Sequence, residues 1–138
     1  MIVQTQTTSF KEELYEGIHD LLTDTIKIAL YTANADIDAD TTVYVVTDEI
    51  TGTGYTAGGN TLTGTTVKSE NGVAYVSFNN TTWAAASFTC RGALIYNFTK
   101  ANRSIAVLNF GSDKIVSNQT FQIQFPPNIP NSAIIRSQ

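Results

Sequence analysis

Apolar positions follow a helical period near the start of the chain and a strand period over most of the rest. Five apolar residues recur at helical spacing and predict one amphipathic helix: Phe10, Leu14, Ile18, Leu21 and Leu22. Ser9 and Glu12 form a capping box, so the helix is expected to begin at Ser9 and to contain Gly17 as a weak point. From Ile26 to Thr32 apolar and polar residues alternate, which predicts the first strand.

The most strand-like part of the chain lies between Trp83 and Phe125. It holds three apolar runs of strand length: Phe88–Tyr96, Ser104–Phe110 and Phe121–Phe125. The polar segments Lys-Ala-Asn-Arg and Gly-Ser-Asp-Lys separate these runs and are expected to be turns. In the first run apolar side chains occupy both alternating faces, which favours a central strand covered on both sides. The three runs therefore predict an antiparallel meander around which the domain is built.

Two further segments have recognisable turn and loop chemistry. Asn71-Gly72, between two apolar stretches, is the strongest short signal for a β-hairpin. Residues 49–60 are rich in glycine and predict a long loop, which in a compact domain is usually functional or held by a neighbour. Tyr55 at the centre of this loop is the expected anchor for a partner surface. Val43–Val46 is a short apolar run whose structure the pattern does not decide.

Three aspartates at alternate positions, Asp36, Asp38 and Asp40, have the spacing of the first ligands in a calcium-binding loop. The rest of that motif is absent. Thr41 occupies the position that needs glycine, and Thr47 occupies the position that needs a bidentate glutamate. An acidic, solvated turn is the better interpretation, with weak cation binding as the alternative.

These elements predict a mainly β, single-domain antiparallel β-sandwich, of the Ig-like or jelly-roll-like type, with one short N-terminal helix and extended terminal arms. The expected division is an N-terminal arm over residues 1–8, a domain over 9–125 and a C-terminal arm over 126–138. Residues 1–8 are expected to form a flexible arm or an added edge strand. Ile134 and Ile135 in the C-terminal arm predict a segment that returns to the sheet or docks on a partner.

Charge and composition exclude several classes of partner. The net charge is −4, and the eight basic residues are scattered, which argues against a nucleic-acid-binding surface. The first ten residues have no basic start and no long apolar segment, so neither a signal peptide nor a membrane span is expected there. Charged residues make up 14% of the chain, and Thr, Asn, Ser and Gln supply the polar surface instead.

No catalytic or metal-binding constellation is apparent in the sequence. The single Cys90 excludes an internal disulfide and is expected to be a buried, inert thiol within a strand. The single His19 is expected to be a partly exposed helix residue. Zinc sites need clusters of His and Cys, and the chain has one of each. We therefore expect no enzyme activity, no cofactor and no metal, although a pair of carboxylates brought together by the fold stays open as an alternative.

The glycine-rich loop and the central strand together resemble a family of small tailed-bacteriophage virion proteins. The loop carries Gly-x-Gly-Tyr-x-x-Gly-Gly over residues 52–59, Thr82-Trp83 follows, and the strand carries Arg-Gly-Ala-Leu-Ile-Tyr-Asn over residues 91–97. In that family a leading helix, a Leu-Tyr strand, such a loop and such a strand recur in this order. The resemblance covers about residues 9–112.

The resemblance implies a virion structural protein, and first of all a capsid decoration (cement) protein on the outer shell. The alternative is a tail, baseplate or head–tail connector component, including one that binds glycans. The implied partners are the major capsid protein or other virion subunits, with a homotrimer as the expected assembly and neither nucleic acid nor membrane as a partner. Such a protein is made in the cytoplasm of the bacterial host. Residues expected to contact partners are Tyr55, Gly58, Gly59, Ile134 and Ile135; the resemblance supplies no catalytic residues.

Overall fold

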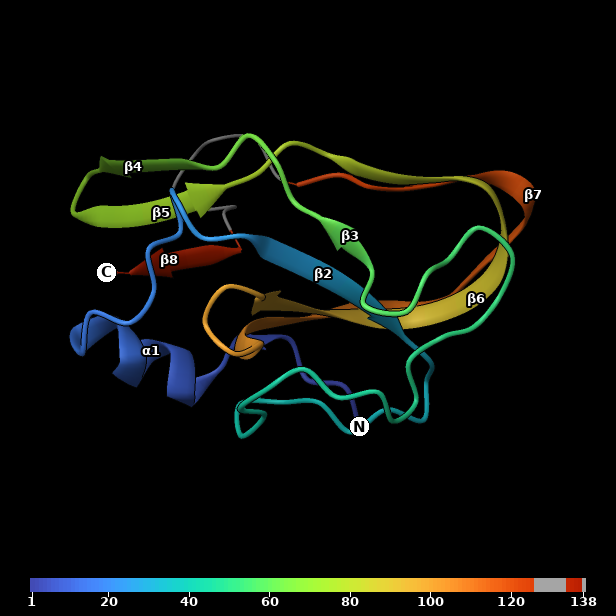
Figure 1. Ribbon diagram of the computed structural model, residues 1–138, viewed down its shortest axis with the longest axis horizontal. Helices are drawn as coiled ribbons and strands as arrows, with labels where there is room; N and C mark the ends of the chain where they lie inside the picture. Colours follow the sequence, from blue (N-terminus) through green and yellow to red (C-terminus); the bar gives the residue numbers. More distant parts are fainter. Residues whose placement is uncertain (126–133, 138) are drawn as a thin grey trace.

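Two antiparallel β-sheets and one short helix make up the computed structural model, which describes residues 1–125 and 134–137 (Figure 1). The larger sheet has the strand order β1-β7-β6-β2-β3, and the smaller one has the order β4-β5-β8. The strands are Thr5–Gln6 (β1), Ile26–Tyr31 (β2), Asn60–Thr61 (β3), Thr66–Glu70 (β4), Val73–Ser77 (β5), Thr81–Asn97 (β6), Arg103–Ile123 (β7) and Ile135–Ser137 (β8). The predicted mainly β, sandwich-like fold with one helix is confirmed.

The predicted three-stranded meander is wrong in one respect, because Gly-Ser-Asp-Lys is a bulge and not a turn. Gly92 pairs with Asn109 and Cys90 pairs with Lys114, so residues 110–113 of β7 stand opposite Arg91 alone. Gly111 within this bulge has a φ of 82°, which an L residue rarely adopts. A bulge bends the strand that carries it, and here β6 and β7 continue past it as one long hairpin.

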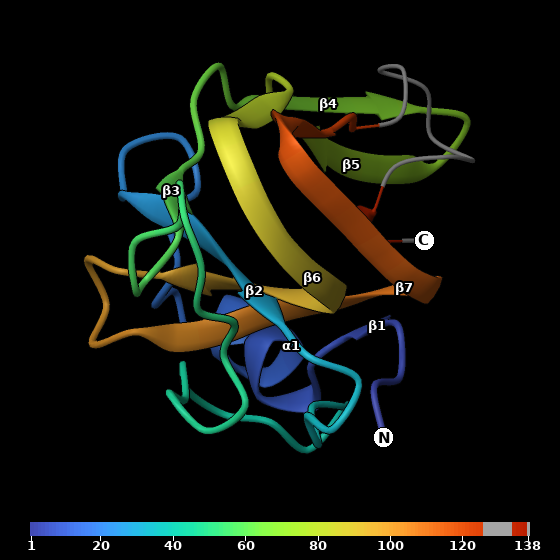
Figure 2. The same cartoon turned by 90° about the vertical axis from the view of Figure 1, so that its right-hand side faces the viewer.

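The β6–β7 hairpin belongs to the larger sheet but contributes to both layers of the sandwich (Figure 1). Its inner half lies in the layer that contains β2, and its outer half lies in the opposite layer. Figures 1 and 2 show the hairpin bending, so that its outer half, which contains the start of β6 and the end of β7, crosses over its inner half beside β2. The main core fills the space between the two halves and contains Ile28, Leu30, Trp83, Phe88, Ile95 and Ile105, among others. Trp83 is 3% exposed, and its indole N–H has no hydrogen-bond partner among the described residues.

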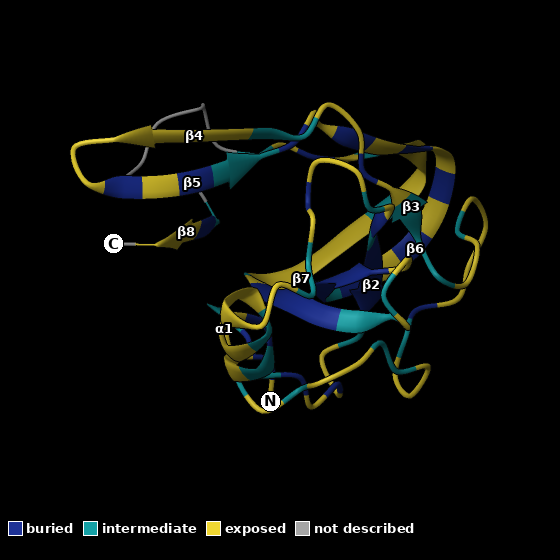
Figure 3. Ribbon diagram, turned by 60° about the vertical axis from the view of Figure 1, so that its left-hand side comes forward, coloured by how far each residue is buried: buried dark blue, intermediate teal, exposed yellow. Residues whose placement is uncertain are grey.

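A second, smaller core covers the other face of the larger sheet. It consists of Ile2, Ala29, Tyr31, Ala35, Ile37, Leu94, Tyr96 and Val107. Because apolar residues cover both faces, the inner half of β6 and nearly all of β2 are buried, as the dark ribbon in Figure 3 shows. This confirms the prediction that the first apolar run is a central strand covered on both sides.

Helix α1 spans Thr8–Tyr15, and its ends differ from the predicted ones. The N-cap is Thr7, whose hydroxyl accepts a hydrogen bond from the backbone N–H of Phe10 at 3.4 Å. At the other end Gly17 has a φ of 74° and donates to Leu14 O, while Ile18 N–H bonds to Glu13 O. This is a Schellman motif, so Gly17 terminates the helix instead of weakening its interior.

Both described ends of the chain pair with the domain. β1 pairs with β7 through Thr5 and Val107, which confirms an added edge strand for the N-terminal arm. β8 pairs with β5, so this part of the C-terminal arm returns to the sheet. Residues 126–133 and 138 of the predicted C-terminal arm lie outside the described residues.

The predicted hairpin at Asn71-Gly72 is confirmed. Asn71 and Gly72 have φ values of 53° and 81° and connect β4 to β5. Positive φ at both central residues is the signature of a type I′ turn, whose twist matches that of the flanking strands. The resulting small sheet projects beside α1, and β4 is largely exposed (Figure 3).

Candidate functional site

The glycine-rich loop is fastened to the sheet by one carboxylate. Glu49, which forms an isolated bridge with Tyr31 at the end of β2, accepts hydrogen bonds from the hydroxyls of Tyr44 and Tyr55. Its Oε2 also accepts from the backbone N–H of Gly58 at 2.8 Å. The carboxylate thus joins three points of the segment between β2 and β3. Hydrogen bonds to an ionised acceptor are stronger than neutral ones, so this arrangement restrains the segment firmly.

Two tyrosines extend the same network into the sheet. The hydroxyl of Tyr55 accepts a hydrogen bond from Leu30 N–H in β2 at 3.1 Å, and Tyr96 in β6 donates to Gly58 O at 2.6 Å. Tyr44 stacks on Tyr96, with ring centroids 4.7 Å apart. We call Glu49, Tyr44, Tyr55, Gly58 and Tyr96 the Glu49 lock. It brings the loop motif at residues 52–59 and the strand motif at residues 91–97 into direct contact.

Gly59 is required by the close approach of this loop to β2. A Cβ at this position would lie 1.8 Å from the carbonyl oxygen of Ile28, and the φ of Gly59 is 79°. No side chain fits there, because the obstructing atom belongs to the backbone of a central strand. Gly59 therefore serves the packing of the loop against β2.

The tyrosines of the lock are held in their protonated form. Burial, followed by the nearby charge of Glu49, raises the pKa of Tyr96 to about 12. Burial and the hydrogen bond to Glu49 likewise raise the pKa values of Tyr44 and Tyr55 well above the usual value. Hydroxyls in this state act as hydrogen-bond donors and not as bases, so the chemistry of the lock is restraint of the loop.

The residues predicted to contact partners all have contacts inside the chain. Tyr55 and Gly58 belong to the lock, and Tyr55 also packs against Trp83 and Phe88. Gly59 lies against β2, Ile135 is 3% exposed in the main core, and Ile134 packs beside that core. Contact of these residues with a partner stays a prediction.

Sequence reasoning missed the central role of Glu49, for which the pattern indicates only the start of a loop. Tyr44 and Tyr96 likewise stand in the sequence as members of apolar runs. The one signal in the sequence is a carboxylate directly before a glycine-rich loop that contains tyrosine. Nothing in the local spacing joins that carboxylate to Tyr96, because the connection depends on how the loop folds onto β6.

The lock lies beside an exposed turn formed by residues 46–48, which we call the Val46 turn. Glu49 N–H donates to Val46 O at 3.2 Å, and Thr32 N–H donates to Asp48 O at 2.9 Å. The hydroxyl of Tyr31 donates to Val45 O at 2.6 Å just before the turn. Val46 is 71% exposed despite these restraints. A rigid backbone therefore presents an aliphatic side chain, with Asp48 next to it, to solvent.

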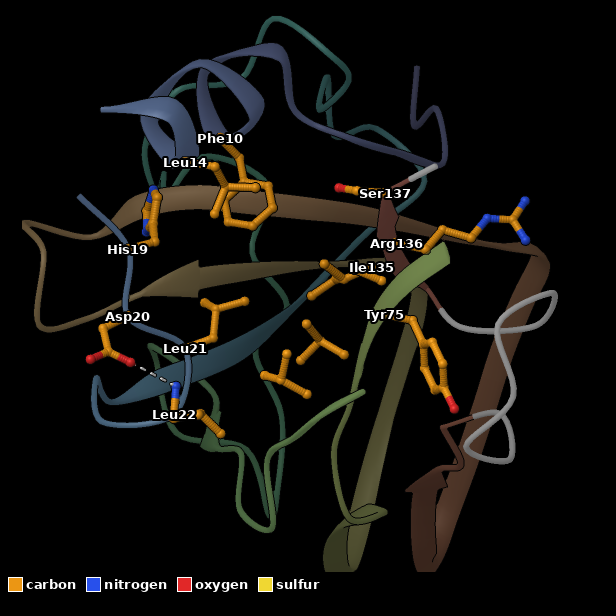
Figure 4. A pocket seen from close by; sticks show the side chains of 13 residues that line it. Phe10, Leu14, His19, Asp20, Leu21, Leu22, Tyr75, Ile135, Arg136 and Ser137 are labelled. Atoms are coloured by element: carbon orange, nitrogen blue, oxygen red, sulfur yellow. Dashed lines mark hydrogen bonds between the residues drawn. The ribbon is translucent and has the colours of Figure 1, made fainter. Parts of the chain in front are cut away.

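A groove separates α1 and the residues after it from the small sheet (Figure 4). Its inner part encloses about 440 Å³ and is mostly apolar; the lining includes Phe10, Leu14, Leu21, Leu22, Val67, Val76 and Ile135. A second hollow of about 600 Å³ adjoins it and is lined by Gln6, Lys11, Leu14, Tyr15, Arg136 and Ser137. The two share Leu14, Arg136 and Ser137, so they are parts of one helix groove.

His19 is not the partly exposed helix residue that was predicted. It follows the Schellman turn, its side chain is fully buried, and its Nε2 lies 2.9 Å from Glu13 Oε1. Its Nδ1 lies 3.0 Å from Nδ2 of the buried Asn97. Because Asn97 Oδ1 accepts from Lys100 N–H, Nδ2 is the donor to His19 and to Asp24. His19 Nδ1 is therefore the acceptor in its contact with Asn97, and Nε2 faces the Glu13 carboxylate.

Two ion pairs flank His19 and Asn97. Together with these two residues they form what we call the His19 cluster. Lys100 Nζ lies 3.1 Å from Asp24 Oδ2, and Arg103 Nη1 lies 2.7 Å from Glu13 Oε2. Burial acts to raise the pKa of Asp24, but hydrogen bonds from Asn97, the backbone and Lys100 outweigh it and lower that pKa. The cluster connects α1 to the turn between β6 and β7.

The remaining candidate sites show no reactive arrangement among the described residues. Asp38 Oδ1 accepts from Asp40 N–H at 2.9 Å, and Asp36 lies 3.3 Å from the N-terminal amine, as expected for a solvated acidic turn. Within residues 1–125 and 134–137 no three His, Cys, Asp or Glu side chains are grouped to hold a metal ion. Cys90 is fully buried, and burial raises the pKa of its thiol to about 12, which keeps it protonated.

Comparison of the chain with protein-family models, with curated proteins and with solved structures gives no match. In the described part of the chain, no helix has both the length and the apolar character needed to cross a membrane.

Proposed function

We propose that this chain is a structural subunit of a tailed-bacteriophage virion, and specifically a capsid decoration (cement) protein that binds the outer surface of the shell. Its function is then carried by contacts with the major capsid protein and with other copies, not by chemistry. The Glu49 lock is the observation that carries the proposal. It unites the two motifs on which the resemblance to phage virion proteins rests.

The lock supports an assembly role because its polar groups are engaged within the chain. The carboxylate of Glu49 receives three hydrogen bonds, and the hydroxyl of Tyr55 both donates and accepts. A catalytic site needs groups that can reach a substrate, whereas these groups fix the backbone of a loop. A rigid loop beside an exposed turn is useful to a protein that recognises another subunit, because little conformational entropy is lost on binding.

The exposed surface of the outer hairpin half also supports the proposal. β1 pairs with β7 only at Ala106 and Val107, so within residues 1–125 and 134–137 no strand pairs with the outer half of β7 on the side away from β6, which we call the free edge of β7. Its exposed residues are mostly uncharged, and Ile115 is 73% exposed. This stretch contains two charged residues, Asp113 and Lys114. Asp113 is paired with Arg91 at 3.0 Å. Long strand edges with few charges are adhesive toward other chains.

The test is to mix the fluorescently labelled protein with empty shells from the phage whose genome encodes it. A decoration protein should cosediment with the shells at many copies per particle, and electron microscopy should show it over the whole capsid surface. The bound shells should also survive heating or chelator treatment that opens bare shells. Failure to cosediment with shells or intact particles would refute a virion role.

The same experiment distinguishes a decoration protein from a connector, tail or baseplate component. Label confined to one vertex or to the tail would indicate a connector, tail or baseplate component and refute the decoration role. A matched variant, Ile115→Lys, adds one charge to the free edge of β7 without altering a buried residue. We expect it to weaken shell binding about tenfold while leaving the thermal transition unchanged.

A further inference from the structure

We propose that copies of this chain associate head to tail, with the Val46 turn of one copy seated in the basic end of the helix groove of the next. The occupant of the groove is thus a second copy of the same protein. The inference goes beyond the proposed function because it names a self-association surface that does not depend on the shell.

The Val46 turn has the properties of an inserting element. Val46 is 71% exposed, and Val43 nearby is 42% exposed. The turn is held by hydrogen bonds from Glu49 and Thr32, and by the adjacent bond from Tyr31 to Val45, so it is preorganised. An exposed aliphatic side chain on a rigid turn loses little conformational freedom when it enters a partner.

The turn also lies in an acidic part of the chain. No Lys or Arg occurs between Lys27 and Lys68, whereas this segment contains Asp36, Asp38, Asp40, Asp48 and Glu49. Glu49 is engaged in the lock, and Asp36 lies beside the N-terminal amine. Asp48 is exposed at the end of the turn itself, with a φ of 62°. The inserting element is therefore aliphatic and negatively charged.

The outer hollow of the helix groove has the complementary character. Its lining contains two cationic residues, Lys11 and Arg136, and no carboxylate among the described residues. Leu14 and Tyr15 provide apolar surface in the same hollow and are 38% and 95% exposed. An aliphatic and anionic turn therefore meets apolar and cationic groups, which favours this occupant over a neutral or basic one.

The two surfaces are different parts of the molecule, so the contact is heterologous. Such a contact generates a closed ring when the rotation between neighbours closes, and an open chain otherwise. The charge pairing at the rim of the contact also makes the association sensitive to ionic strength.

Disulfide trapping tests the geometry directly. Val46→Cys and Tyr15→Cys proteins, mixed under mild oxidation, should form a cross-linked heterodimer at least tenfold faster than a mixture of Ile115→Cys with Tyr15→Cys. Cys90 does not interfere, since it is fully buried and its thiol is protonated. Equal cross-linking in both mixtures would overturn the proposal. Rapid disulfide formation by Val46→Cys alone would overturn it too, because it indicates a two-fold contact between like turns.

Sedimentation of unmodified variants tests the chemistry. Val46→Ser and Lys11→Glu should each weaken self-association at least tenfold, and added salt should weaken that of the wild type. Lys114→Glu makes the same charge change on the free edge of β7 and should leave self-association unchanged. A wild type that stays monomeric at millimolar concentration would overturn the inference. So would equal effects of Lys11→Glu and Lys114→Glu.

The two proposals fail separately. Self-association is measured without shells, and shell binding can be measured with the Val46→Ser protein. Shell binding without self-association would refute the head-to-tail contact and leave the decoration role in place. Self-association without shell binding would refute the decoration role and leave the head-to-tail contact in place.

Discussion

The protein contains two buried polar networks, and they are built on different principles. The Glu49 lock gathers neutral hydroxyl and amide donors around one carboxylate. The His19 cluster instead combines an imidazole and an amide with two ion pairs, Asp24–Lys100 and Glu13–Arg103. The first fixes a loop against the sheet, and the second fixes the end of a helix against a turn. The loop is thus held by uncharged donors around a single carboxylate, whereas the helix is held by ion pairs in which both partners carry charge.

The largest effect is expected from filling the space between the lock and β2. Gly59→Ala should destabilise the fold by about 4 kcal/mol or more, because its Cβ would lie 1.8 Å from the backbone oxygen of Ile28. Gly72→Ala is the control, since Gly72 also has positive φ but a Cβ added there would meet nothing within 4 Å. That control should cost about 1 kcal/mol. Urea denaturation of both proteins measures the difference, and equal costs would contradict this account of Gly59.

Removing the charge of the lock should have the next largest effect. Glu49→Gln replaces an acceptor of three hydrogen bonds by an amide whose NH₂ faces other donors, and should cost about 2 kcal/mol. Glu70→Gln on the exposed hairpin makes the same change in charge and should cost almost nothing. Hydrogen exchange should show faster opening of residues 49–60 in Glu49→Gln than in the wild type. Unchanged protection there would refute the role given to Glu49.

A smaller effect is expected from one hydroxyl of the lock. Tyr96→Phe removes the donor to Gly58 O and should destabilise the protein by about 1 kcal/mol. Tyr15→Phe is a matched control, because Tyr15 is 95% exposed and its loss of a hydroxyl should not change stability. Thermal denaturation compares the two variants. A Tyr96→Phe protein as stable as the control would show that the Tyr96 bond contributes no net stability.

The smallest effect belongs to the His19 cluster and appears in acid. The folded-state pKa of Asp24 is lowered, so its contribution to stability is present above the unfolded value of about 4 and is lost as pH falls through the folded value. Asp24→Asn should therefore flatten the dependence of unfolding free energy on pH below about 4. Denaturation curves between neutral pH and the acid limit of the fold measure this slope. An unchanged slope would show that Asp24 does not contribute to the loss of stability in acid.

Local patterns were enough to predict several elements of the fold. Alternation predicted the strand at Ile26–Tyr31, and Asn71-Gly72 predicted the hairpin, because in both cases the decisive chemistry lies within a few residues. The helix was predicted, but its boundaries were not. Thr7 and Ser9 are both competent caps, and which of them is used depends on the pairing of the preceding strand β1.

The bulge and the lock could not be predicted in the same way. Gly111 allows positive φ in a turn and in a bulge alike, and only the pairing of residues on both sides with β6 decides between them. The link between Glu49 and Tyr96 joins segments that meet only when the loop folds onto the sheet. In each case the residue type was informative, but its partner was set by tertiary structure.

The bend of the β6–β7 hairpin at residues 110–113 has a mechanical consequence. Since the same two strands run through both layers, a pull on the outer half is transmitted along an unbroken backbone into the layer that holds β2. The layers cannot peel apart one after the other as separately connected sheets can. Such a load passes through the bulge at Gly111, where the pairing of β6 with β7 is interrupted and the Arg91–Asp113 pair at 3.0 Å joins the two strands.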